Sequence, residues 1–180
     1  MKNKIIFFLL YILLVSSALA ENLNIQSLNI TIDKKTKTTI FQNEVSAEDE
    51  KNNKLLTEYA EYNKDLQLFK TIGKTTVLTS GGFIIEGNDV IFDNNIKYIK
   101  SDNPATIKDL EQNEIYLDNF EYSTSDSFFK SVGNIKIIDS KNNKYNFTQI
   151  YIDEKKKEIV GTDSKTFLNQ EGFKINKDNK

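Results

Sequence analysis

The chain repeats itself every 30 residues, without a gap, from about residue 60 to about residue 175. Apolar residues recur at five positions of the repeat, in the columns Ala60, Val90, Phe120 and Ile150; Tyr62, Phe92, Tyr122 and Ile152; Phe69, Ile99, Phe129 and Ile159; Val77, Ile107, Ile137 and Phe167; and Ile85, Ile115, Tyr145 and Ile175. A fixed period of this length is typical of stacked repeats, in which one unit cannot bury its apolar face alone. The sequence therefore predicts a serial fold.

The repeat continues weakly toward the N-terminus. One repeat earlier, four of these columns hold Ile30, Ile32, Ala47 and Leu55, and Asp33 and Asn43 lie one period before the turn-type residues Asn63 and Gly73. Thr39, however, stands where later repeats carry Phe or Ile. A degraded outer repeat of this kind is expected of an end cap. Residues 21–29 form a short polar lead-in.

Within a repeat, short runs rich in Ile, Phe, Tyr, Val and Thr are separated by turn-forming residues, which favours strands. In the clearest repeat we predict strands at residues 83–86, 89–92, 96–101 and 105–109, with turns at 93–95 and near 110–113 and a break at 102–104. The apolar residues alternate and do not recur at the three- and four-residue spacing of a helix. Residues 55–66 contain helix-forming residues, yet their apolar positions fall in the strand columns.

The apolar side of each strand changes parity part-way along. Ile85 lies at an odd position, whereas Val90 and Phe92 lie at even ones. Successive side chains point to opposite faces, so this change requires a bulge or bend near Gly87-Asn88, and Asn103 and Gly133 mark a similar break on the returning strands. The predicted fold class is all-β, with stacked antiparallel strands in two facing sheets forming an open β-jellyroll (β-taco) built from about 30-residue repeats. About ten strands would give a slab on the order of 50 Å long.

Composition excludes several classes of site. The chain has no His, Cys or Trp, which removes thiol nucleophiles, His-dependent triads, ordinary zinc or copper sites and disulfides. No acidic loop has the EF-hand spacing, so we expect no metal and no cofactor. The formal net charge of −2 does not favour nucleic-acid binding. Acidic residues fall mostly in predicted turns, as Asp93, Asp109, Asp139 and Asp153 do, and a carbohydrate-acting enzyme would need paired carboxylates on an exposed face. We therefore expect no enzymatic activity.

Residues 1–20 have the pattern of a cleaved signal peptide. Lys2 and Lys4 form a positive head, residues 5–15 are mainly apolar, and an A-x-A cleavage site, Ala18-Leu19-Ala20, precedes Glu21. The apolar run is shorter than the roughly 20 residues that a membrane anchor needs. Cleavage would leave 22 Lys against 26 acidic residues, a net charge of −4.

The inward-facing columns can be interpreted in two ways. They can pack on one another, as in a conventional β-sandwich, or they can line an apolar groove that is open along one side. An apolar stripe of this length favours an apolar ligand. The residues alone leave both interpretations open.

Four segments resemble a known family. They are VIFDNN at Val90 to Asn95, SVGNIKIIDSKNNKY at Ser131 to Tyr145, IYIDEKKKEIVGTD at Ile150 to Asp163, and the partial AEYNKD at Ala60 to Asp65. These segments, in register behind a signal peptide, are similar to the OstA-like periplasmic β-jellyroll of the lipopolysaccharide transport (Lpt) proteins. The resemblance covers about residues 30–180, the expected jellyroll domain.

The resemblance implies a periplasmic role in lipopolysaccharide transport and outer-membrane assembly, in which the groove shields acyl chains. The implied lipid-facing positions are Ile85, Phe92, Ile99, Ile107, Ile115, Phe120, Tyr122, Phe129, Ile137, Tyr145, Ile150, Ile152 and Ile159. The implied partners are lipopolysaccharide and other jellyroll-containing Lpt proteins that pair edge to edge. No catalytic residue is implied.

Two members of that family fit the chain. One is a soluble periplasmic bridge with a single jellyroll. The other is the outer-membrane translocon, which would add an outer-membrane barrel and its lipoprotein partner. Phe173 and Ile175 begin a strand that lacks its companion, so we expect a jellyroll truncated at its C-terminus and favour the translocon.

Two further expectations do not depend on the choice of member. Open edges near Ile30 and Ile175 would leave backbone groups unpaired, which predicts head-to-tail pairing with another jellyroll. The alternative function is that of a structural or adhesive exported β-repeat protein with a packed core and no lipid ligand.

Overall fold

The computed structural model describes residues 23–169, so the expected signal peptide and the half repeat at Phe173 and Ile175 lie outside the described residues. Every element of the described part is a β-strand, which confirms the all-β prediction, and this part contains no helix that could span a membrane. The strands are β1 (Asn24–Gln26), β2 (Asn29–Asp33), β3 (Thr38–Glu48), β4 (Lys54–Asn63), β5 (Leu68–Thr71), β6 (Lys74–Leu78), β7 (Ile84–Asn88), β8 (Ile91–Asp93), β9 (Tyr98–Ser101), β10 (Ala105–Lys108), β11 (Glu114–Leu117), β12 (Phe120–Ser123), β13 (Phe128–Ile138), β14 (Lys144–Asp153), β15 (Glu158–Thr162) and β16 (Lys165–Phe167).

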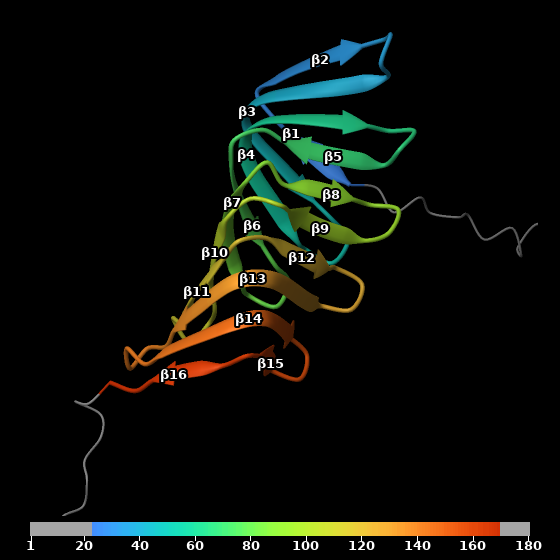
Figure 1. Ribbon diagram of the computed structural model, residues 1–180. Helices are drawn as coiled ribbons and strands as arrows, with labels where there is room; N and C mark the ends of the chain where they lie inside the picture. Colours follow the sequence, from blue (N-terminus) through green and yellow to red (C-terminus); the bar gives the residue numbers. More distant parts are fainter. Residues whose placement is uncertain (1–22, 170–180) are drawn as a thin grey trace, which may run out of the picture.

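The strands form one antiparallel sheet of 16 strands that is folded along a crease into two arms (Figure 1). Arm 1 contains β2, β5, β8, β9, β12 and β15, and arm 2 contains β1, β6, β7, β10, β11 and β16. The long strands β3, β4, β13 and β14 cross the crease and belong to both arms. The two predicted facing sheets are therefore halves of a single sheet, joined through these four strands.

The chain crosses the crease once in every rung of this folded ladder. The rungs are, in order, β1 with β2, β3, β4, β5 with β6, β7 with β8, β9 with β10, β11 with β12, β13, β14, and β15 with β16. Two successive rungs make one 30-residue repeat, as the spacing predicts. In the segment 55–66, residues 55–63 belong to the strand β4 and residues 64–66 to the turn that follows, so this segment is not a helix.

In several rungs the crease contains a residue whose backbone lies in the left-handed region. Asp89, between β7 and β8, has φ 52°, next to the predicted bend at Gly87-Asn88. In rungs that cross the crease in the other direction, Asn43 of β3, Gly73 between β5 and β6, and Gly133 of β13 have φ of 64°, 81° and 129°. The pairing of β3 with β4 and of β13 with β14 shifts by one residue at this point. Such a bulge re-aims the side chains, which accounts for the change of parity.

The turns at the tips of the arms also repeat every 30 residues. The left-handed residues are Lys37, Gln67, Lys97, Ser127 and Lys157 in arm 1, and Asn52, Gly82, Gln112 and Asn142 in arm 2. In three arm 2 turns an aspartate accepts the backbone N–H of an asparagine four residues later, at 2.8–2.9 Å: Asp49 with Asn53, Asp109 with Asn113, and Asp139 with Asn143. The backbone thus keeps the period even where the side chains differ.

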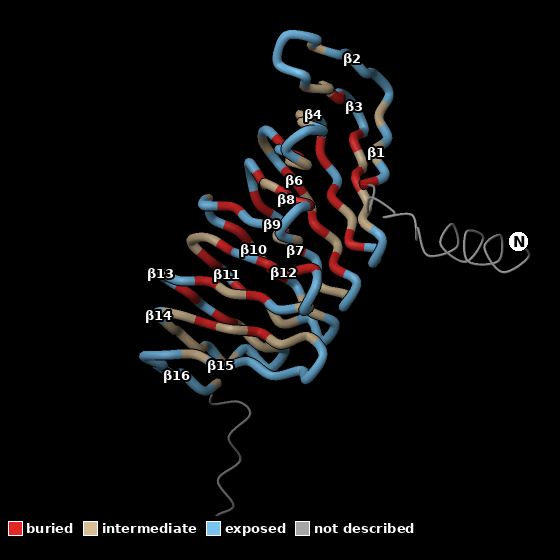
Figure 2. Tube along the Cα trace, turned by 90° about the vertical axis from the view of Figure 1, so that its right-hand side faces the viewer, coloured by how far each residue is buried: buried red, intermediate tan, exposed pale blue. Residues whose placement is uncertain are grey.

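The core consists of two apolar ladders, one in each arm. In arm 1, register pairs connect Tyr62, Phe69, Phe92, Ile99, Tyr122, Phe129, Ile152 and Ile159. In arm 2 they connect Leu55, Val77, Ile85, Ile107, Ile115, Ile137 and Tyr145. Figure 2 shows this buried stripe continuing from rung to rung. Each fully buried Ile or Phe contributes roughly 1.5–3 kcal/mol.

The last rung departs from the predicted columns. Tyr145 pairs with Thr166, which places Phe167 opposite Lys144 in the outward-facing row. The cause is that β15 and β16 keep one continuous register against β14, without the one-residue shift seen in β3 and β13. Phe167 is consequently 56% exposed.

Candidate functional site

The structure brings the two ladders face to face. Of the predicted lipid-facing positions, eleven are buried: Ile85, Phe92, Ile99, Ile107, Ile115, Phe120, Tyr122, Phe129, Ile137, Ile150 and Ile152. Tyr145 is partly buried against this core, and Ile159 is 45% exposed at the C-terminal edge. Each position comes from the inward row of its strand.

The arms are closed on each other where the ladders meet. Ile85 and Ile107 of arm 2 contact the same small space as Phe129 and Ile152 of arm 1, and this space has no room for a water molecule. The apolar columns therefore pack on one another in the middle of the slab. Polar groups buried beside them also have partners, since no buried side-chain nitrogen or oxygen among the described residues lacks a hydrogen bond.

The apolar interior reaches the surface at both ends of the slab. At the N-terminal end, Ile30 and Ile32 of β2 are 57% and 66% exposed. At the other end, Ile159 continues the arm 1 ladder, and Phe147 is only partly buried. In the part of the chain that the structure describes, the first and last rungs have a neighbouring rung on one side only, so their inward side chains are left partly uncovered.

A polar cluster closes the mouth between the arm tips, and sequence reasoning missed it. Glu154, just beyond β14 in arm 1, accepts hydrogen bonds from Thr79 Oγ1 of arm 2 and from the Tyr122 hydroxyl, each at 2.8 Å. The Tyr122 hydroxyl also lies 3.4 Å from the buried Asn53 side-chain oxygen. Glu154 and Thr79 are 75 residues apart, so no local pattern could have indicated this contact.

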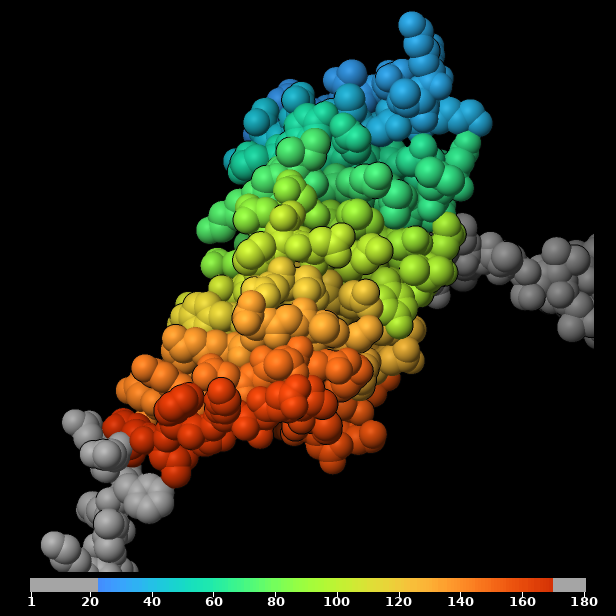
Figure 3. All heavy atoms as spheres, viewed as in Figure 1, coloured from blue at the N-terminus to red at the C-terminus, as the bar shows by residue number. Residues whose placement is uncertain are grey.

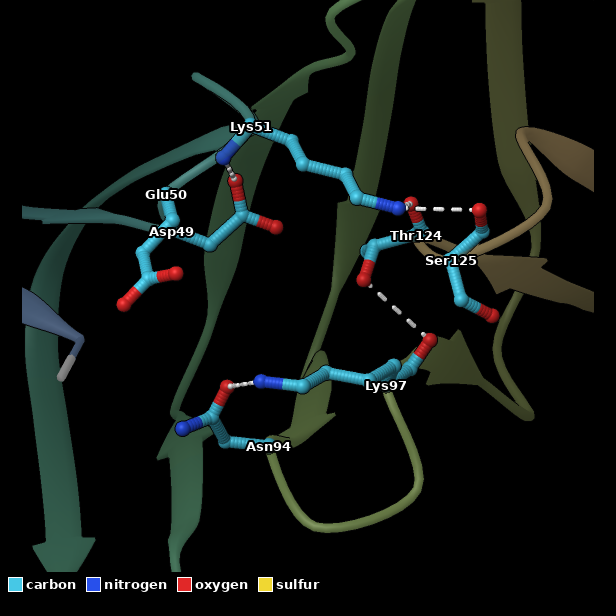
Figure 4. A pocket seen from close by; sticks show the side chains of 7 residues that line it. All are labelled: Asp49, Glu50, Lys51, Asn94, Lys97, Thr124 and Ser125. Atoms are coloured by element: carbon cyan, nitrogen blue, oxygen red, sulfur yellow. Dashed lines mark hydrogen bonds between the residues drawn. The ribbon is translucent and has the colours of Figure 1, made fainter. Parts of the chain in front are cut away.

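A second contact between the tips involves Lys51. Its ammonium group donates to the backbone oxygens of Thr124 at 3.0 Å and Ser125 at 2.9 Å, on the opposite arm. Figure 4 shows this lysine spanning a polar pocket of about 100 Å³. Lys97 and Asn94 of arm 1 line the other side of the pocket.

Burial sets the electrostatics of the mouth. Desolvation raises the pKa of the Glu154 carboxyl, and the hydrogen bonds from Thr79 and Tyr122 oppose this shift only in part. Desolvation also raises the pKa of the Tyr122 hydroxyl, and the neighbouring Glu154 charge raises it further. Tyr122 therefore remains a neutral hydrogen-bond donor at physiological pH.

Nothing in the described part suggests a metal centre. Residues 23–169 contain no group of three or more His, Cys, Asp or Glu side chains that could hold a metal ion. The aspartates Asp93, Asp109, Asp139 and Asp153 accept N–H groups of their own turns, which is a structural role.

Comparisons with known proteins gave one type of match. No protein-family model matches the chain, and no curated protein matches it. The chain is structurally similar to LptH. This protein of Pseudomonas aeruginosa is described as the LptA-homologous periplasmic component of the conserved lipopolysaccharide transport device. The match has 10% sequence identity and a TM-score of 0.33, and it covers 83% of this chain and 96% of LptH.

Proposed function

We propose that this protein acts in periplasmic lipopolysaccharide transport and outer-membrane assembly, shielding acyl chains between its two arms. The observation that carries the proposal is the pair of continuous apolar ladders. They run through the slab from Leu55 and Tyr62 to Tyr145 and Ile159, and they face each other. Beyond Tyr62 the inward row of arm 1 continues through Thr39 to the exposed Ile32. The family resemblance of the sequence supports the same ligand.

The chemistry of the ladders suits a lipid in transit. Keeping acyl chains out of water is worth about 0.8 kcal/mol for each methylene buried. A wall of interchangeable Ile, Val and Phe side chains offers this along its whole length without a specific polar site that would trap the lipid. The proposed lining is the set of inward positions given above, from Ile85 to Ile159.

The open edges support the proposed partners. Within residues 23–169, β2 at one end and β15 with β16 at the other each pair on one side only, so their outer backbone groups can accept another strand. Exposed Ile30 and Ile32 beside the N-terminal edge would continue the apolar path into a neighbouring jellyroll. We propose edge-to-edge pairing with other Lpt jellyrolls, either as a soluble bridge or as part of the outer-membrane translocon. The signal-peptide pattern supports a periplasmic location.

A second function is favoured by the closed core. Because the ladders already pack on each other with no room for water, a structural or adhesive β-repeat protein needs no ligand to explain the apolar columns. The two functions differ in one property, which is whether a lipid reaches the inward face.

A photo-crosslinking amino acid tests this difference. Placed in turn at Phe92, Phe129 and Ile150, it should attach labelled lipopolysaccharide, whereas the outward positions Lys136 and Tyr151 should not react. Attachment at none of the inward positions, or equally at both sets, would contradict lipid transport.

The terminal rung offers a matched pair that does not disturb the core. Ile159 and Val160 are adjacent in β15 and are 45% and 59% exposed, but Ile159 pairs with Ile152 on the inward face and Val160 with Tyr151 on the outward face. A probe at Ile159 should capture the lipid and one at Val160 should not. Equal labelling would show only surface adsorption.

A further inference from the structure

The two arms are held together differently at their two margins. At the crease, the long strands β3, β4, β13 and β14 join the arms through the backbone. At the mouth, side chains from turns connect the tips: Glu154 with Thr79, and Lys51 with Thr124 and Ser125. The bulged crease can therefore act as a hinge between the arms, and the few side-chain contacts at the mouth hold the arm tips together.

The arm 2 turn at residues 79–83 is arranged to receive the Glu154 side chain from arm 1. Thr79 Oγ1 donates to Glu154 and accepts the backbone N–H of Phe83 at 3.0 Å, so its hydroxyl is fixed in orientation. Gly81 leaves the necessary space, because a Cβ there would lie 2.5 Å from Glu154 Oε2. The turn of arm 2 therefore accommodates the carboxyl group of arm 1.

The same contact lies directly over the closed apolar interior. Thr79 and Glu154 line the small space that also contacts Ile85, Ile107 and Phe129. A ligand entering between the tips here would have to displace Glu154 first. The carboxyl group is held by two neutral hydroxyls while burial disfavours its charge, so releasing it to water regains solvation.

The second contact between the arm tips is made by Lys51. Lys51 reaches two backbone oxygens of the opposite turn, and its repeat counterpart Lys141 lies in an equivalent turn. Both lysines lie at exposed positions. They differ in their contacts, because the Lys51 ammonium group bonds the opposite arm, whereas the backbone oxygen of Lys141 accepts the side-chain amide of Asn169.

We propose that Glu154 and Lys51 form a clasp that keeps the mouth between the arms shut, and that releasing the clasp opens the apolar interior to its ligand. The identity of the ligand rests on the proposed function, whereas the opening of the arms does not.

Distance measurements between the tips test the clasp itself. The chain has no cysteine, so Glu50→Cys with Lys155→Cys places two unique thiols on opposite tips. Nitroxide labels on this pair should give one short distance population with the clasp intact. Adding Thr79→Val, or Glu154→Ala with Lys51→Ala, should create a second, longer population. The controls Glu158→Ala and Lys141→Ala should not.

A cleavable crosslink between the same thiols tests the link to ligand uptake without altering the clasp residues. Locked protein should capture labelled lipopolysaccharide at a Phe129 photo-probe at least tenfold less than unlocked protein, and cleavage should restore capture. An unchanged distance distribution in folded clasp variants, verified by circular dichroism, would overturn the clasp. Detectable capture that is equal for locked and unlocked protein would also overturn it. If the distances lengthen while no variant captures lipid, the clasp stands and the proposed function fails.

Discussion

Phe120 and Phe129 stack in the core of arm 1, with ring centroids 5.9 Å apart and ring planes 12° apart. They lie diagonally across the pair β12–β13 and are 1% and 3% exposed. Aromatic pairs of this kind add about 0.5–1.5 kcal/mol to the contribution from burial. The stack therefore connects the rung formed by β11 and β12 to the next rung, β13.

Phe120→Ala should lower the free energy of unfolding by about 3–5 kcal/mol, because it empties a fully buried site in a closed core. Urea denaturation followed by circular dichroism measures this loss. Phe128→Ala is the matched control, since Phe128 is 37% exposed and contacts Tyr151 on the outer face, and it should cost less than about 1.5 kcal/mol. Equal losses for both variants would show that the interior is not packed as described.

Gly133→Ala should destabilise the crease. Gly133 has φ 129°, and a Cβ at this position would lie 2.8 Å from a carboxylate oxygen of Asp118. A loss of about 1–3 kcal/mol is expected from backbone strain and crowding together. Gly87→Ala serves as the control. A Cβ at Gly87 would make ordinary contacts of 3.5 Å and 3.6 Å with Ala105 and Phe120, so this variant should be neutral or slightly stabilising in thermal denaturation.

The fold was predictable because the residues that recur every 30 positions are apolar side chains that must face inward. The column that contains Ile85 and Ile115 alternates in the arm 2 ladder with the column that contains Ile107, with which both residues pair. The crease was also predictable, because a change in parity between Ile85 and Val90 leaves few residues where the strand can bend. Asp89 lies within that interval.

Other features depended on information that a local pattern does not contain. The sequence shows which side chains point inward, but the distance between the arms depends on the angle at the crease, so the close packing of Ile85 and Ile107 against Phe129 and Ile152 was not predictable. The exposed Phe167 follows from a missing one-residue shift in the last rung. Glu154 gave no signal because Thr79 and Tyr122 are remote in sequence.

Asn53→Ala should lower the free energy of unfolding more than most substitutions of polar residues do. The Asn53 side chain is fully buried, donates to Asp49 at 2.8 Å and accepts the Ser80 backbone N–H at 2.9 Å. Leaving these buried groups unpaired should cost about 1–3 kcal/mol. Asn113→Ala is the control in the equivalent turn, where the side chain is only partly buried and bonds Ser140 at 3.2 Å, so a smaller loss is expected in urea denaturation. A larger loss at Asn113 would contradict the assignment of Asn53 to the mouth cluster.

The pH dependence of stability should have two phases of opposite sign. Burial raises the pKa of Glu154 in the folded protein, so its stabilising contribution is full below the unfolded pKa and is lost as the pH rises through the folded value. Unfolding free energy should therefore rise as the pH falls from 7 toward the ordinary glutamate range. Asp33 behaves oppositely, because backbone N–H groups, that of Lys35 first, lower its pKa, and its contribution is lost in more acidic solution.

Urea denaturation from pH 7 to pH 3 separates the two phases. Glu154→Gln should remove the initial rise and keep the later fall, because the amide cannot titrate. Its carbonyl oxygen can accept one of the two hydrogen bonds that Thr79 and Tyr122 donate to separate carboxylate oxygens, and its NH2 group can donate to the other hydroxyl oxygen. Glu158→Gln removes a carboxyl group from the exposed start of β15 and should leave both phases in place. If Glu154→Gln retained the rise, another carboxyl group would be its source, and Glu154 would carry its charge freely in the folded protein.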